Sequence, residues 1–449
     1  MTLPYITIES FEKNVYNQFS SDTNCPKCEA QDILIVWDGA RCGLIGMGVR
    51  GIIGSTIAKV VNYGFNPSYL YYFLKTQYAI INKRPRGVGI PHVDPELFWN
   101  IHIPIPPLQE QHRIVAKIEE LFTQLDAGIA SLKKAQVQLK HYRQAFLKSA
   151  FEGKLTQEWR EQHKDEIEPG NVDILRDLTP HQERKRKTRS VKLLPVVTDV
   201  TLTLPKSWSV VRLGQVVSII DYRGRTPPFE EQGFIPHLRS SNIKNGKILW
   251  ENLAYVTEEV YNKYMTRGLP KKSDLLFTTE APLGEVAPAP DKKFSLAQRI
   301  MIIRAFEQVL TPKFLQYQIT SDLFQSQLHR RGTGTTVMGV SSRNFQQLIL
   351  RLPPLKEQYK IVEKIEYHLS IADQIEKILD NNLKQAESLH KSILKKAFEG
   401  KLVPQNPSDE PASVFLERIK VEKAQLQPKI RKNRKFIKVN QARLITNGE

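Results

Sequence analysis

Three short patterns in the sequence have residue types that a metal or catalytic site would need. CPKC at 25–28 has the spacing of half a zinc site. TPPF at 226–229 is similar to the Asn/Asp-Pro-Pro-Tyr/Phe motif of adenine methyltransferases. GTGTT at 332–336 has the glycine content of a phosphate-binding loop. Each pattern implies a chemistry that other residues would have to complete.

The rest of the sequence supplies few of those partners. Cys42 is the only other cysteine, so a zinc site would need a His or Asp ligand, and the alternative is plain loop cysteines. Thr226 lacks the amide or carboxylate that accepts the adenine amino hydrogen, and no glycine-rich cofactor loop accompanies it. GTGTT is not followed by Gly-Lys-Ser/Thr. We therefore expect no cofactor and no catalytic activity in the chain alone.

The charge of the chain favours a polyanionic partner. The sequence has 65 Lys and Arg against 47 Asp and Glu, a net charge of +18. Nucleic acid is the simplest such partner, and an acidic membrane surface is the alternative. No apolar stretch is long enough to span a membrane, and the start MTLPYITIES lacks the basic and apolar regions of a signal peptide. Three cysteines are not a disulfide framework, so we expect a cytoplasmic protein.

Loop positions rich in Arg, Lys, Ser, Thr and Asn are candidates for contact with DNA, because these side chains bind phosphates and base edges. Any one of them could equally be a solvated loop residue, and His92, which follows a proline in a turn, could instead cap a helix. The candidates in the second half are Arg223 and Arg225 in RGRTPP, Arg239, Ser240, Ser241, Asn242 and Lys244 in LRSSNIK, and Arg330, Arg331, Thr333, Thr335 and Thr336 in RRGTGTT. The candidates in the first half are Arg41, Arg50, Lys83, Arg84, Arg86 and His92.

A duplicated segment must position these loops. PPLQEQHRIVAKIEE at 106–120 matches PPLKEQYKIVEKIEY at 353–367, and the same shift of 247 brings AFEGKL at 150–155 onto 397–402. Apolar residues recur every seven positions in both copies, with a second row between them. The main rows are Ile118, Leu125, Leu132, Leu139 and Phe146 in the first copy and Ile365, Ala372, Leu379, Ala386 and Ile393 in the second.

Two such rows predict a coiled-coil helix in each copy. The proline pairs at 106–107 and 353–354 stand where a helix starts, and Gly153 and Gly400 stand where one stops. About 40 residues give a rod of about 60 Å. The two rods are expected to bury their apolar rows against each other.

The segments before the two helices predict mixed α/β domains with the same order of elements. MTLPYITIE matches GFIPHLRSSNI, DILIVWDGA matches DLLFTTEAP, and NPSYLYYFLKTQ matches TPKFLQYQITSD. Nothing in the first copy matches residues 195–233, which include LPKSWSVVRLG, so the front of the first domain is expected to be missing. The expected divisions are a first domain at 1–105, a helix at 106–155, a linker with a basic run at 156–194, a second domain at 195–352, a helix at 353–402 and a basic tail at 403–449.

This arrangement resembles the specificity subunit of Type I restriction–modification enzymes. The resemblance rests on the paired PPLxEQxxIVxKIE…AFEGKL segments, LPKSWSVVRLG, DILIVWDGA, and the GVGIPH and GTGTTV turns, and it covers nearly the whole chain. It implies an α+β fold with two target-recognition domains held apart by an antiparallel coiled coil. Each domain would read half of a gapped site in double-stranded DNA. The coiled coil would set the spacing and dock two adenine methyltransferase subunits, which endonuclease/translocase subunits then join.

Two alternatives remain open from the sequence. The missing front could leave a degenerate or half-functional subunit, unless the start is misassigned and the segment is encoded upstream. The chain could instead be a coiled-coil scaffold that joins proteins without reading DNA, and its behaviour would then be insensitive to salt.

Overall fold

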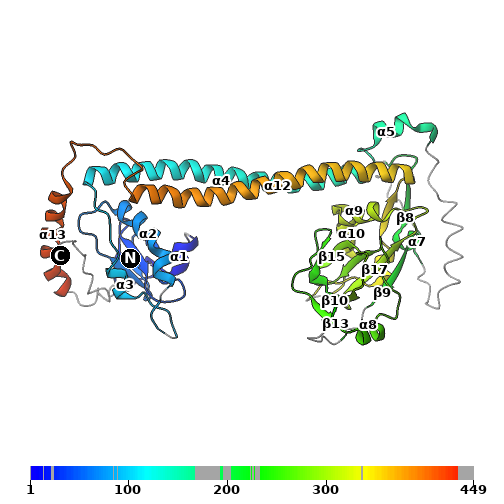
Figure 1. The fold of residues 1–449 in the computed structure, drawn as a ribbon, viewed down its shortest axis with the longest axis horizontal. Coiled ribbons are helices and arrows are strands. Elements are labelled where there is room, and N and C mark those ends of the chain that lie inside the picture. Colours follow the sequence, from blue (N-terminus) through cyan, green and yellow to red (C-terminus); the bar gives the residue numbers. More distant parts are fainter. Residues whose placement is uncertain are drawn as a thin grey trace. The chain divides into compact units, whose positions relative to one another are not determined.

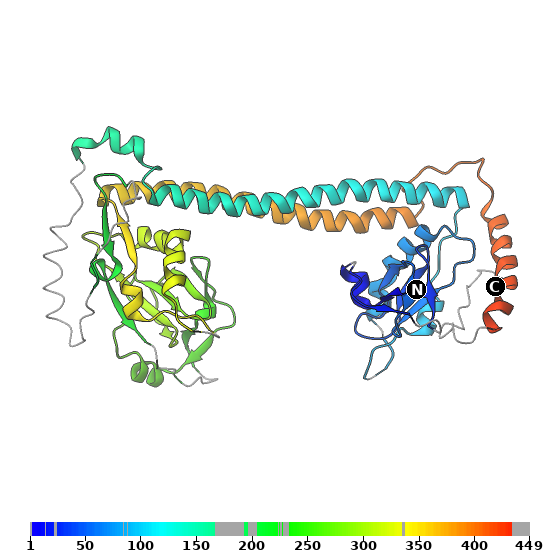
Figure 2. The ribbon, with the colours of Figure 1, turned by 180° about the vertical axis from the view of Figure 1, so that it is seen from behind.

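The computed structural model divides the chain into two compact units. The first unit combines Met1–Lys134 with Leu379–Glu449, and the second is Ala135–Ile378. The first unit therefore contains both ends of the chain (Figure 1, Figure 2). The structure describes residues 2–13, 15–21, 25–83, 85–87, 89–166, 193–195, 204–222, 224, 227, 233–334 and 337–432.

Two helices of 44 residues each run through both units: α4 (Leu108–Phe151) and α12 (Leu355–Phe398). Each begins directly after its proline pair, as the sequence predicts. Each ends two residues before a glycine with left-handed backbone, where φ is +76° at Gly153 and +69° at Gly400. A rise of 1.5 Å per residue gives each helix a length of about 66 Å.

The heptad row of α12 is buried as predicted. The exposed fractions are 0% for Ile365, 1% for Ala372, 8% for Leu379, 7% for Ala386 and 6% for Ile393. The second apolar row of α12 is less completely buried, because Ile375 is 41% exposed and Leu389 is 49% exposed. The seam is therefore narrower than a full two-row coiled coil.

The two helices pair antiparallel within each unit. In the first unit, His390 Nε2 lies 3.1 Å from Asp126 Oδ1, and the start of α4 packs with the end of α12 in one core. In the second unit, Arg143 pairs with Asp373 at 2.8 Å, and the end of α4 packs with the start of α12. This pairing confirms that the repeated helices form an antiparallel coiled coil.

The first unit carries two small sheets, ordered β2-β1-β6-β3 and β5-β4-β7. Strand β1 pairs with β6 parallel, and the other pairings are antiparallel. Strand β4 reads ILIV and is fully buried, as a continuous β-branched and apolar run predicts. The elements are β1 (Leu3–Ile6), α1 (Ile8–Lys13), β2 (Phe19–Ser20), β3 (Lys27–Cys28), β4 (Ile33–Val36), β5 (Ile45–Met47), β6 (Gly51–Ile53), β7 (Ile57–Val60), α2 (Pro67–Lys83), α3 (Pro95–Trp99) and α13 (Ala412–Lys432).

Helix α13 corrects the expectation of a basic tail from residue 403. Phe415 and Ile419, one helical turn apart, are each 3% exposed in the core of the first unit. The Phe415 ring meets that of Phe65 edge-on at 5.5 Å between centroids. Just before the helix, Asp409 accepts from both terminal nitrogens of Arg113, at 3.1 and 2.6 Å. The segment is thus part of the first domain, and in both views it lies beside the N-terminal strands (Figure 1, Figure 2).

The second unit repeats the first and adds strands to it. Its sheets are ordered β13-β10-β16, β15-β14-β17-β9, β18-β8 and β11-β12. The elements are α5 (Gln157–Gln162), the 3-10 helix η1 (Lys164–Glu166), β8 (Ser209–Arg212), α7 (Leu213–Val216), β9 (Val217–Asp221), β10 (Ile235–Leu238), the 3-10 helix η2 (Ser240–Asn242), β11 (Ile243–Lys244), β12 (Lys247–Ile248), β13 (Ala254–Val256), α8 (Glu258–Tyr264), β14 (Leu275–Thr279), β15 (Leu283–Pro288), β16 (Ser295–Leu296), β17 (Ile300–Ala305), α9 (Pro312–Thr320), α10 (Asp322–Arg331), α11 (Ser342–Gln346) and β18 (Ile349–Leu352).

The correspondence between the units follows the sequence repeat. Strand β10 pairs parallel with β16 as β1 does with β6, and β14 lies between β15 and β17 as β4 lies between β5 and β7. An ion pair joins the equivalent strands in both units: Asp32 with Lys59 at 2.6 Å, and Asp274 with Arg304 at 2.7 Å. Strands β8 and β9 of the second unit come from the segment that has no match in the first copy.

Candidate nucleic-acid interface

The turn between β14 and β15 brings two of the predicted loops of the second unit together. On one side, Ser240 Oγ donates to the carbonyl of Ala281 at 2.9 Å. On the other side, Gly339 forms bridges with both Glu280 and Thr333. The loop after β10 and the glycine-rich loop after α10 therefore flank the same turn.

Four predicted residues are exposed around this turn: Arg239, Ser241, Lys244 and Thr333. Arg330 and Arg331 also belong to this region, but they lie in the last turn of α10 rather than in a loop. Arg330 is exposed, and Arg331 is half-buried. The cluster thus combines cations with neutral hydroxyls, which are the groups that bind phosphates and read base edges.

Sequence reasoning missed Arg299 as a member of this surface. Its guanidinium Nε lies 2.7 Å from Glu280 Oε1, and its side chain is 44% exposed. Strand pairing between β14 and β17 places it beside the turn, because Thr279 N donates to the carbonyl of Arg299 at 2.9 Å. The comparison of the two copies gives no signal for it, because the equivalent backbone bond of the first unit runs from Trp37 N–H to the carbonyl of Thr56.

Ser240 and Asn242 do not fit the role predicted for them. They are 7% and 6% exposed. Asn242 Oδ1 accepts from the backbone N–H of Arg239 at 3.0 Å, and its amide donates to the Leu249 carbonyl at 3.3 Å. Because their polar groups hold the loop together, we leave both residues out of the proposed DNA surface.

Five predicted residues lie outside the part of the chain that the structure describes: Arg84, Arg223, Arg225, Thr335 and Thr336. The RGRTPP and TPPF patterns fall largely in the same undescribed part.

The first unit has an equivalent turn after β4. His92 Nδ1 lies 2.6 Å from Asp38 Oδ1, and His92 forms bridges with both Asp38 and Arg86. This repeats the relation of Gly339 to Glu280 and Thr333 in the second unit. His92 therefore holds a turn and does not cap a helix. The cap of α3 is Asp94, whose carboxylate accepts from the N–H of Glu96 at 3.0 Å.

Of three further cations predicted in the first unit, two lie near this turn and the third does not. Arg41 is exposed within the turn and pairs with Glu12 at 2.9 Å. Lys83 ends α2, where the Asn82 amide donates to the carbonyl of Cys42 at 3.0 Å. Arg50 lies beyond the opposite end of β5, so the structure does not bring it to the cluster.

Cys28 and Cys42 do not share a site. Cys28 Sγ donates to the carbonyl of Val49 at 3.1 Å, and burial raises the pKa of its thiol to about 11. Cys42 is buried in a different core cluster from Cys28. Among the described residues, no group of three or more His, Cys, Asp or Glu could hold a metal ion.

A buried histidine stands just behind the cation cluster of the second unit. His237 in β10 is 0% exposed, and its Nδ1 lies 2.7 Å from Ser295 Oγ. Burial, assisted by the nearby positive charge of Arg239, lowers its pKa to about 4. His237 is therefore a neutral core residue at physiological pH.

The comparisons with known proteins decide the family. The family described as Type I restriction modification DNA specificity domain matches residues 1–140 and 205–385. The chain belongs to this family. The chain is 25% identical over 420 residues to the EcoBI specificity subunit of Escherichia coli, covering 90% of this chain and 82% of that one. It is 28% identical over 416 residues to the MjaVIII specificity subunit of Methanocaldococcus jannaschii, covering 90% and 87%.

A solved structure shares the fold. The matching chain comes from a study of complex assembly and conformational transition in a type I R-M system, with a TM-score of 0.65 and 19% sequence identity. The match covers 89% of this chain and 92% of that one. The chain is thus a specificity subunit, a non-catalytic component whose role is the recognition of DNA sequence. Among the described residues, no helix combines the length and apolar character needed to cross a bilayer.

Proposed function

We propose that each unit reads one half of a bipartite, gapped site in double-stranded DNA, through the surface around its strand-end turn. The second-unit surface consists of Arg239, Ser241, Lys244, Arg299, Arg330 and Thr333, with Arg331 at its edge. The first-unit surface consists of Arg41, Lys83, Arg86 and His92.

The observation that carries this proposal is the repeated turn. Equivalent strands, β4 and β14, each lead into a turn with an acidic residue (Asp38 or Glu280) that bridges to a second loop. Exposed cations and hydroxyls surround the turn in the second unit, and exposed cations with a histidine surround it in the first. Two copies of one reading surface in one chain fit a target with two parts.

The long helices have a separate task in this proposal. Rigid helices of about 66 Å are long enough to fix the distance between two recognition elements on a duplex, where one helical turn spans about 34–36 Å. We propose that they set the gap and dock two adenine methyltransferase subunits, with endonuclease/translocase subunits joining that core. A structure with the same fold comes from a study of complex assembly in a type I R-M system, which supports a role of this chain in an assembly with other subunits.

Mapping adenine methylation tests the proposal. The chain would be expressed with its methyltransferase partner in a host that lacks other adenine methylation, and the genome would be sequenced for modified bases. We expect a motif of two specified parts around an unspecified gap. A motif with a single specified part would show that one unit does not read DNA. Complete absence of a motif, with the complex assembled, would favour the scaffold alternative.

A further inference from the structure

A loop closes against each strand-end turn, and the two loops have the same construction. In the first unit, the N–H groups of Arg86 and His92 donate to each other's carbonyls, both at 2.9 Å. In the second unit, Thr333 and Gly339 form the same pair of bonds at 2.8 and 3.0 Å. The shift of 247 that relates the two copies brings 86 onto 333 and 92 onto 339. The two loops are therefore equivalent and equal in length.

The chain that leaves each loop is anchored in its unit. Val93 is 1% exposed and donates its N–H to the carbonyl of Trp37 at 2.9 Å. Its equivalent, Val340, is 2% exposed and donates to the carbonyl of Thr279 at 3.0 Å. Because buried chain follows at once, each loop stands on a fixed base.

A glycine with left-handed backbone fixes the course of each loop. The φ angle is +103° at Gly87 and +119° at Gly334. A Cβ added at Gly87 would lie 2.9 Å from the carbonyl oxygen of Ile90, and one added at Gly334 would collide with the carbonyl of Val337. The backbone thus folds back at the same place in both units, with Ile90 or Val337 opposite the glycine.

The residue opposite the glycine is an exposed, β-branched aliphatic in both units. Ile90 is 62% exposed and Val337 is 48% exposed. A single exposed apolar side chain is ordinary on a protein surface. These two occupy equivalent positions, however, in loops where only the glycine is identical between 86–92 and 333–339. Because an exposed side chain adds little to the core, the shared aliphatic character indicates a contact with a partner.

The two aliphatic residues stand among the groups of the proposed DNA surface. Arg86 and His92 close the first loop, Thr333 closes the second, and Arg330 lies at the end of α10 just before it. Such cations and polar groups bind phosphates and the hydrogen-bonding atoms of base edges. The C5-methyl group of thymine is the one feature of the major groove that calls for an apolar side chain.

The sizes of the two side chains favour a methyl contact over insertion between base pairs. Side chains that separate stacked bases include Phe, Leu, Ile and Met. Val337 branches at Cβ and extends one carbon less than Ile90, so it is too short to fill an opened base step. Both side chains carry methyl groups that can contact the methyl group of a thymine.

We propose that Ile90 and Val337 are specificity-determining residues, each of which contacts the C5-methyl group of a thymine in its own half of the DNA site. The inference rests on the proposed function, because it requires each unit to read one half-site. It adds an apolar contact with a base to surfaces that otherwise consist of cations, hydroxyls and a histidine.

Duplexes that lack single methyl groups test the contact. The duplex carries the motif found by methylation mapping, and deoxyuridine replaces thymidine at one position at a time, which removes the methyl group and keeps the base pair. Fluorescence anisotropy measures binding by the wild-type chain in its methyltransferase complex. We expect one thymine in each half whose replacement weakens binding about fourfold, the factor that burial of one methyl group contributes.

Two variants assign each thymine to its loop. Val337→Ala should weaken binding to the thymidine duplex and abolish the effect of deoxyuridine in one half only. Ile90→Ala should do the same in the other half. Leu269→Ala is the matched control, because it removes an aliphatic side chain that is 50% exposed. Arg304 donates to both the Leu269 carbonyl and Asp274, which places Leu269 at the opposite end of β14 from the turn.

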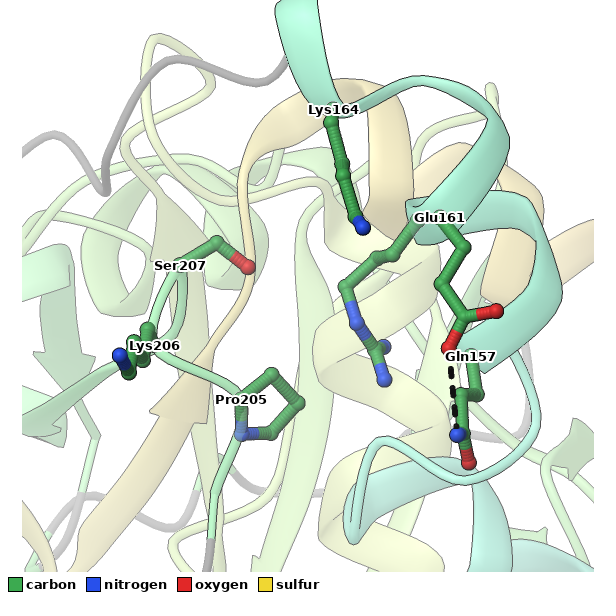
Figure 3. Close-up of a pocket in the computed structure, with 7 residues that line it drawn as sticks. Gln157, Glu161, Lys164, Pro205, Lys206 and Ser207 are labelled. Atoms are coloured by element: carbon green, nitrogen blue, oxygen red, sulfur yellow. Dashed lines mark hydrogen bonds between the residues drawn. The ribbon is translucent and has the colours of Figure 1, made fainter.

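A control that changes charge lies at the cavity beside α5. Figure 3 shows Lys164 and Ser207 on opposite sides of this cavity of about 610 Å³. Neither residue belongs to a loop or turn of the proposed surface. Lys164→Ala removes an exposed cation and no apolar contact. It should therefore leave the ratio of the affinities for the thymidine and deoxyuridine duplexes unchanged in both halves.

The outcomes separate this inference from the proposed function. If the wild type prefers the mapped duplex to random DNA but binds every deoxyuridine duplex equally well, the inference is wrong and the proposed function stands. Deoxyuridine effects that persist in Val337→Ala and Ile90→Ala would also overturn it. So would a rise in 2-aminopurine fluorescence on binding without any deoxyuridine effect, because that result indicates insertion between bases. A chain with no preference for the mapped duplex would overturn the proposed function and this inference with it.

Discussion

The salt dependence of DNA binding shows which single side chains of the proposed surface contact phosphates. Arg330 is exposed at the end of α10, and we expect it to contact a phosphate. Arg330→Ala should weaken binding to a duplex of random sequence and reduce the slope of log K against log salt by about 0.9. Fluorescence anisotropy from low to moderate salt measures both quantities. Lys263→Ala is the matched control, because α8 lies at the opposite end of β10 from Arg239. An unchanged slope in Arg330→Ala would remove α10 from the interface.

The buried His237 predicts a pH dependence of stability. Its pKa is about 4 in the folded protein, against an ordinary value near 6.5. Between these two pH values, the imidazole of His237 is protonated in the unfolded chain but stays neutral in the native protein. The free energy of unfolding should therefore fall by about 1.4 kcal/mol per pH unit as pH drops from about 6.5 towards 4.

Urea denaturation at several pH values measures this pH dependence, and His237→Asn is expected to flatten it. His329→Asn changes an exposed histidine and should leave it intact. Equal slopes in all three proteins would contradict the assignment.

Among the elements, α13 allows the most specific prediction of how a substitution changes stability. Phe415→Ala should destabilise the first unit by about 3–5 kcal/mol, because it removes a buried ring from a packed core. Val421→Ala changes a residue of the same helix that is 56% exposed and should be nearly neutral. Hydrogen exchange across residues 57–83 would report the loss locally. If the Phe415→Ala protein kept wild-type protection, α13 would not contribute to the core of the first unit, and the expectation of a basic tail would stand.

The elements also show what the sequence could and could not predict. The seam of α12 was predictable because a seven-residue spacing is visible in one stretch of chain. Helix α13 was not, because its burial depends on Phe65, which is distant in sequence from Phe415 and Ile419. For the candidate surface, residue type identified Arg239 and Lys244 but could not distinguish a serine or asparagine that reads a base from one that holds its own loop. That difference depends on carbonyls contributed by other strands.

At the scale of the whole molecule, the proposal requires the two units to read independently. Ser241 and Thr333 are neutral, so Ser241→Ala with Thr333→Ala should not change the phosphate attraction. It should instead reduce the base specificity in one part of the methylated motif only. Arg86→Ala with His92→Ala should reduce the base specificity in the other part, because those residues belong to the equivalent turn of the first unit. Methylation mapping of both variants, with the wild type as reference, measures the two parts separately, and the length of the gap should remain constant because neither pair touches α4 or α12. If either variant degraded both parts equally, the division of reading between the two units would be wrong. If the first-unit variant left the motif unchanged, the first unit would not be a reader, even though it carries the same turn.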